Sequence, residues 1–136
     1  MNYFRKLFFI IFLVVLGITV WQINTVLAFA GGTGTSGDPY QITTCTELQD
    51  MGSYLTSFFI LNNAIDCTDT STWNAGAGFV PVGTLATKFT GGFNGAGYVI
   101  DNLFISRSTT DYVGLFGYVD GTDVEYIKDV GLTDVN

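Results

Sequence analysis

The chain has 136 residues, enough for one folded domain; 48% of them are apolar and only 12% are charged. It contains no histidine, which excludes acid–base catalysis and metal sites that depend on histidine. Two of its five basic residues are Arg5 and Lys6, whereas all twelve acidic residues lie beyond position 37. The chain after residue 30 is therefore strongly acidic, which argues against a nucleic acid as partner.

Residues 1–30 have the composition of an export signal. The basic pair precedes an uncharged apolar run, Leu7–Val20, and the small residues Ala28 and Ala30 lie where a signal peptidase reads the chain. Cleavage after Ala30 is predicted, with the released segment helical as a free peptide. The alternative is an uncleaved membrane anchor, but the apolar run is shorter than the roughly 20 residues that span a bilayer.

The next residues predict a leader, a strand and a helix. Residues 31–37 are rich in glycine and are expected to form a flexible leader, and Asp38–Ile42 should form a first short strand. Thr44 and Glu47 have the spacing of a capping box, in which each side chain bonds the backbone N–H of the other. A helix is therefore predicted over 45–55, with one apolar face covering an open end of the core.

The remaining chain is expected to form short strands separated by turns. Residues 68–78, rich in Thr, Asn and Gly, predict a loop. Pro81 cannot donate a ladder hydrogen bond, so its segment should lie at an edge or corner. The predicted extended segments are Phe58–Leu61, Ala64–Cys67, Phe79–Val82, Tyr98–Ile105 and Val124–Leu132.

An internal repeat predicts a solenoid. In one alignment Ile100 matches Ile127, and Asp101 falls opposite Lys128. Such a repeat of short strands and turns is typical of stacked coils of chain. The glycines at 91, 92, 95, 97, 114 and 117 are then expected to serve tight bends and close backbone contacts.

Cys45 and Cys67 are the only cysteines, an even number in a chain predicted to be exported. A disulfide between them is expected, which would join the helix to the following strands. Two buried free thiols are the alternative. A cysteine nucleophile is disfavoured because no histidine is present to activate it.

The ordered series Asp38–Ile42, Ala64–Asp66, Phe89–Ile100 and Gly114–Gly117 resembles the N-terminal part of bacterial secreted proteins with GLUG-motif repeats. The resemblance implies an all-β fold over 38–136, a right-handed parallel β-helix with one N-terminal capping helix. It further implies a cell-surface or adhesin-type scaffold, and further repeats of the same chain beyond Asn136.

Several acidic residues are candidates for chemistry. Glycan-cleaving enzymes need two carboxylates about 5–10 Å apart, one with a raised pKa, and stacked strands could bring such a pair together from Asp66, Asp69, Asp101 and Asp129. Calcium could bind Asp66 with Asp69, or the acidic residues within 120–125, although neither has the spacing of a known calcium loop. The expected function is nevertheless non-enzymatic, with no cofactor or metal; a carbohydrate-active protein or the accessory region of a secreted hydrolase is the alternative.

Aromatic residues make up 15% of the chain, and most are expected in the core. Outward-facing members would form a strip that binds a glycan or a surface protein. The candidates for such a strip are Phe104, Tyr112, Tyr118 and Tyr126.

Overall fold

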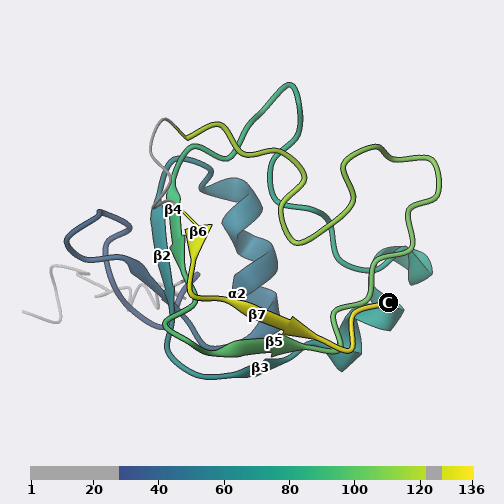
Figure 1. The fold of residues 1–136 in the computed structure, drawn as a ribbon, viewed down its shortest axis with the longest axis horizontal. Coiled ribbons are helices and arrows are strands. Elements are labelled where there is room, and N and C mark those ends of the chain that lie inside the picture. Colours follow the sequence, from purple (N-terminus) through teal and green to yellow (C-terminus); the bar gives the residue numbers. More distant parts are fainter. Residues whose placement is uncertain (1–27, 122–126) are drawn as a thin grey trace, which may run out of the picture.

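A computed structural model describes residues 28–121 and 127–136 (Figure 1). The predicted apolar run of the export signal, and Val124, Glu125 and Tyr126 of the last predicted strand, lie outside these residues. In chain order the elements are β1 (Tyr40–Ile42), α2 (Cys45–Asp50), the 3-10 helix η1 (Met51–Ser53), β2 (Phe58–Leu61), β3 (Ile65–Asp66), the 3-10 segment η2 (Thr68–Gly76), β4 (Gly92–Asn94), β5 (Val99–Asp101), β6 (Ile127–Lys128) and β7 (Gly131–Thr133).

The seven strands found in the described residues form two parallel sheets. One has the order β1-β2-β4-β6 and the other β3-β5-β7. In Figure 1 the sheets stand as two walls that meet at a corner, because β2, β4 and β6 each lead through a short turn into a strand of the second sheet. Like side chains therefore lie over like side chains in successive strands.

This stacking builds the core. The paired residues Phe59 and Phe93, and Ile65 and Ile100, are at most 3% exposed. The segments between the sheets add three fully buried side chains, and the ring of one of them, Phe89, lies 6.2 Å from that of Phe59. These three side chains are Phe79, Val82 and Phe89.

The predicted helix start is confirmed, but the helix is shorter than expected. The Glu47 N–H donates to Thr44 Oγ1 (3.2 Å), and the Thr44 N–H donates to Glu47 Oε2 (2.9 Å). The α-helix ends at Asp50 and continues as one 3-10 turn, where Gly52 disfavours helix. Leu48 and Met51 are fully buried, so this helical segment covers part of the core as expected.

Residues 31–37 are tied to the body of the fold. The Gln41 N–H donates to the carbonyl of Gly31 (2.9 Å), and the Phe58 N–H donates to that of Gly34 (2.9 Å). The segment predicted as a flexible leader thus adds backbone hydrogen bonds to both β1 and β2.

The expected right-handed β-helix over 38–136 is wrong. Outside the two sheets, the described residues carry isolated bridges such as Val82 with Phe116 and Phe89 with Val119, in place of a third stacked sheet. Pro81 lacks an N–H to donate, and Asn74 in η2 has a left-handed backbone conformation that interrupts regular structure. The architecture is two small parallel sheets with short helices, and no closed solenoid forms in the described residues.

The predicted repeat alignment is also wrong in register. Ile100 lies opposite Leu132, and Asp101 lies opposite Thr133 rather than Lys128. The turn between β4 and β5 spans 95–98, whereas the turn between β6 and β7 spans only 129–130. Because the two turns differ in length, no single offset aligns both strands.

The glycines of the central stretch are structural, as predicted, with one exception. A Cβ at Gly91 would collide with the backbone carbonyl of Ser57, and Gly97 has φ of +80°. Gly114, by contrast, would place a Cβ in ordinary contact distance of its nearest neighbour. The requirement for glycine therefore comes from close backbone approach at some positions and from left-handed conformation at others.

Gly91→Ala is expected to lower the free energy of unfolding by about 1–3 kcal/mol, because the added methyl group must push β4 away from the segment before β2. Urea unfolding followed by circular dichroism measures the change. Gly37→Ala is the matched control, because a Cβ there meets no atom within 4 Å. Equal stability of the two variants would show that β4 does not approach Ser57 as described.

Candidate functional site

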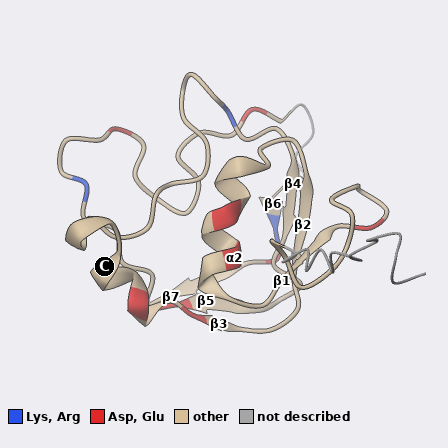
Figure 2. Ribbon diagram, turned by 180° about the vertical axis from the view of Figure 1, so that it is seen from behind, with Lys and Arg blue, Asp and Glu red and all other residues tan. Residues whose placement is uncertain are grey.

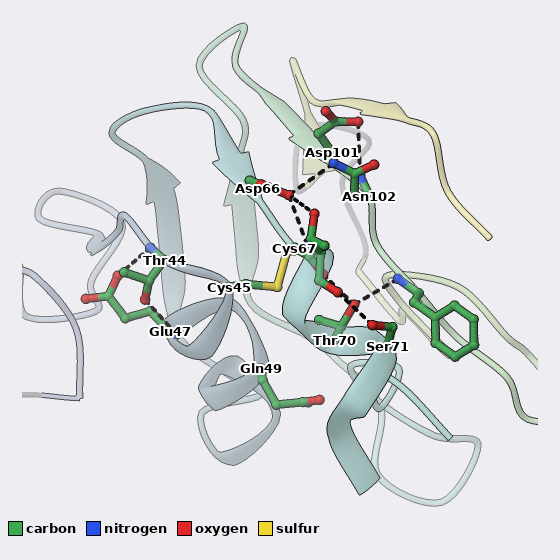
Figure 3. The surroundings of a disulfide bond; sticks show 12 residues. Thr44, Cys45, Glu47, Gln49, Asp66, Cys67, Thr70, Ser71, Asp101 and Asn102 are labelled. Atoms are coloured by element: carbon green, nitrogen blue, oxygen red, sulfur yellow. Dashed lines mark hydrogen bonds between the residues drawn. A yellow bond between two sulfur atoms is a disulfide. The ribbon is translucent and has the colours of Figure 1, made fainter. Parts of the chain in front are cut away.

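A disulfide joins the helix to the second sheet (Figure 3). Cys45 is the first residue of α2 and Cys67 follows β3; their Cα atoms are 5.4 Å apart, and both side chains are buried. The predicted pairing is therefore present. It closes a loop with a sequence separation of 22, for which chain entropy gives on the order of 3 kcal/mol.

A buried threonine continues this connection into the next layer of chain. Thr70 is fully buried; its hydroxyl donates to the carbonyl of Cys67 (2.6 Å) and accepts from the N–H of Phe104 (2.9 Å). Neither backbone group lies within a regular sheet, so the hydroxyl replaces ladder hydrogen bonds at this point. Sequence reasoning missed this residue, because its loop contains several similar threonines.

The carboxylate of Asp66 accepts several hydrogen bonds at the end of β3. Its Oδ1 accepts from the Thr68 hydroxyl (2.6 Å), the Thr68 N–H (3.0 Å) and the Asn102 side-chain amide (3.1 Å). These bonds, led by that from the Thr68 hydroxyl, lower the pKa of Asp66 below its usual value.

Asp101 lies beside Asp66 in the parallel pairing of β3 and β5. Its Oδ1 accepts from the Asn102 N–H (3.0 Å) and from the Thr133 hydroxyl of β7 (2.8 Å). A row of polar side chains thus crosses the edge of all three strands, with Asn102 touching both carboxylates. We call Asp66, Asp101, Asn102 and Thr133 the polar ladder.

The other predicted carboxylates do not join the polar ladder. Asp69 lies in η2, and Asp129 lies in the turn between β6 and β7. Of the four candidates for glycan cleavage, the structure brings only Asp66 and Asp101 together. The lowered pKa of Asp66 is opposite to the shift that a general acid requires.

The described residues hold no group of three or more acidic or cysteine side chains placed to bind a metal ion. Asp66 is hydrogen-bonded to Thr68 and Asn102, and Asp69 is not among these partners. Asp120 forms an exposed ion pair with Lys88 (2.6 Å), and its predicted calcium partners at 123 and 125 lie outside the described residues.

The predicted aromatic strip is only partly assembled. Tyr112 and Tyr118 meet edge to face with ring centroids 5.6 Å apart, and Lys88 lies 5.4 Å from the Tyr118 ring. Phe104 instead packs against Gly78. A Cβ added at Gly78 would collide with the backbone carbonyl and the ring of Phe104. Tyr126 lies outside the described residues, so the pair of tyrosines is what remains of the strip.

Charged side chains are dispersed over the molecule. Figure 2 shows the basic residues on separate loops and on β6, with acidic residues on α2, near β3 and on loops. This distribution forms neither a basic groove nor a concentrated acidic centre in the part of the chain that the structure describes.

An open apolar cavity of about 220 Å³ lies beside β7. Leu132 and Val135 line it and are 41% and 54% exposed. Leu115, from the Gly-Leu-Phe-Gly motif, forms part of the same wall. The cavity is lined almost entirely by aliphatic groups and offers no acid–base chemistry.

Two proteins of known sequence are similar to this chain over about two thirds of its length. Residues of this chain are 38% identical over 92 positions to a "Putative Gly-rich membrane protein" of Evansella cellulosilytica, covering 67% of this chain. They are 39% identical over 101 positions to "Halomucin" of Haloquadratum walsbyi, covering 68% of this chain. The matched regions span only 11% and 1% of those proteins.

No family model matches the chain, and no solved structure matches it. Among the described residues, no helix combines the length and apolar character needed to cross a bilayer. The two relatives are much longer proteins, and this chain matches only a small part of each.

Thr70→Val should lower the free energy of unfolding by about 1–3 kcal/mol, because it leaves the Phe104 N–H without its buried acceptor. Thr72→Val is the control: Thr72 is exposed and its hydroxyl only donates to a nearby carbonyl, that of Asp69. Denaturant titration of both variants measures the difference. Equal losses would show that the burial of Thr70 has no special effect.

The lowered pKa of Asp66 makes its stabilising contribution depend on pH. The contribution is fully present above the unfolded pKa of about 4 and is lost as pH falls through the lower folded pKa. The stability difference between the wild type and Asp66→Asn should therefore shrink as pH is lowered from 6 to 2. Thermal unfolding across this range tests it, and a difference independent of pH would contradict the assignment.

Proposed function

We propose that this chain is an exported, non-enzymatic scaffold module of a membrane- or surface-associated protein. The observation that carries the proposal is the disulfide between Cys45 and Cys67, because such bonds persist in oxidising compartments outside the cytoplasm. The N-terminal basic pair and the apolar run that follows it have the composition of an export signal, which also supports a location outside the cytoplasm. The name of the Evansella relative, a membrane protein, agrees with this location.

The geometry of the polar ladder supports a structural role. Asp66 and Asp101 bind neighbouring strands and turns through their carboxylates, and the pKa of Asp66 is lowered. Catalytic acids in glycan cleavage need the opposite shift. The resemblance of the sequence to GLUG-repeat proteins is a separate argument for a surface role, although the fold is not the β-helix that this resemblance implied.

A scaffold role also fits the way stability is distributed. The disulfide fixes α2 to β3, Thr70 ties Cys67 to Phe104, and the polar ladder extends the connection to β7. These contacts follow one another across the layers of chain. They stabilise the relative positions of the strands, and the cavity beside β7 is lined by none of the carboxylates or cysteines involved.

Export can be tested with the full chain carrying a C-terminal tag in a bacterial host. The wild type should reach the exported fraction with both cysteines protected from alkylation until reductant is added. A variant with Val14→Asp and Leu16→Asp interrupts the apolar run and should stay in the cytoplasm with two reactive thiols. Wild-type protein retained there with reactive thiols would contradict the proposal.

The non-enzymatic part has its own test. Purified chain is incubated with a panel of bacterial and plant polysaccharides, and new reducing ends are measured. We expect none above background. Release of reducing ends that is abolished by both Asp66→Asn and Asp101→Asn would instead establish the alternative function of glycan cleavage.

A further inference from the structure

Phe29, immediately before the predicted cleavage position, belongs to the folded core. Its side chain is only 4% exposed, and its ring stacks on Tyr40 with centroids 4.5 Å apart. It also meets Tyr54 at 5.2 Å and Phe59 at 5.4 Å, in edge-to-face arrangements. A buried aromatic ring with three aromatic neighbours stabilises the core both by its apolar burial and by its ring–ring packing.

The backbone of the same segment is part of the fold. The Ala30 N–H donates to the carbonyl of Gln41 (3.0 Å), and the Gln41 N–H donates to the carbonyl of Gly31 (2.9 Å). Cleavage after Ala30 would remove from the mature chain both the Phe29 ring and the Ala30 N–H that donates to Gln41. The predicted cleavage position therefore discards part of the folded domain.

A second position that suits a signal peptidase lies two residues earlier. Val26 and Ala28 are short side chains separated by one residue, the A-x-A-like arrangement with valine in the first place. Cleavage after Ala28 keeps Phe29, Ala30 and all of the contacts above in the mature chain.

We infer that the processed chain begins at Phe29, through hydrolysis of the Ala28–Phe29 peptide bond by a signal peptidase. Water adds across the amide, so Ala28 leaves with a carboxylate and Phe29 gains a free amine. Processing takes place on the translocating chain before folding buries Phe29. This inference rests on the export proposed above and specifies its product.

Two substitutions in the full precursor separate the positions. Under this inference Ala30 is the second residue of the mature chain, so Ala30→Leu should leave processing intact; its side chain is exposed, so the fold tolerates the change. If cleavage followed Ala30, the same bulky residue would occupy the position next to the scissile bond and block it. Val26→Glu should give the converse pattern. It places a charged side chain three residues before the Ala28–Phe29 bond and should block cleavage there, whereas it lies five residues before the Ala30–Gly31 bond and should leave cleavage at that bond unaffected.

The readouts are N-terminal sequencing and intact mass of the exported protein. We expect a chain starting at Phe29, unchanged processing in Ala30→Leu, and at least tenfold less processed protein in Val26→Glu. An exported chain starting at Gly31, or an oxidised, membrane-attached and uncleaved chain, overturns this inference and leaves the export proposal standing. An uncleaved cytoplasmic chain with reactive thiols overturns both.

Discussion

In-register parallel stacking is the constraint on which the rest of the structure depends. Once β2 lies on β1 and β4 on β2, Phe59 must pack over Tyr40 and under Phe93, and the turn that follows each strand delivers the second sheet at a fixed place. Close approach of backbones then requires glycine where β4 passes Ser57. The buried aromatic and aliphatic side chains contribute most of the stabilisation, and the polar contacts between neighbouring strands add to it.

Polar side chains in this fold bond backbone N–H and carbonyl groups that have no partner in a sheet. Thr70 satisfies two backbone groups where no sheet exists, and Gln49 does the same for Val80, accepting from its N–H (2.7 Å) and donating to its carbonyl (3.0 Å). Asn102 links two carboxylates that would otherwise repel each other across neighbouring strands. A chain with few charges thus uses neutral side chains to bond backbone and carboxylate groups outside the regular sheets, at the buried Thr70 and at the exposed Val80 alike.

Features contained in a few neighbouring residues were predictable from the sequence. The capping box needs only Thr44 and Glu47, and the strands at 40–42 and 58–61 follow from local composition; the only two cysteines left one possible pair. The register between strands was not predictable, because it depends on turns of unequal length. The burial of Thr70 and of Phe29 arises from contacts distant in sequence, and nothing in their local sequence distinguishes them from exposed residues. The closed solenoid was not predictable either, because the segments around Pro81 and η2 meet later parts of the chain through isolated bridges, such as Val82 with Phe116, and form no third sheet in the described residues.

The placement of the disulfide has a mechanical consequence. Its loop contains α2, η1, β2 and β3, so tension applied at the two ends of an oxidised chain bypasses these elements through the sulfur–sulfur bond. With about 3.4 Å of extension per residue, roughly 75 Å of contour length is withheld until the bond is reduced. The segment 45–67 can therefore keep its length under load while the later strands lengthen, which makes the redox state of its surroundings a control on how far the molecule stretches.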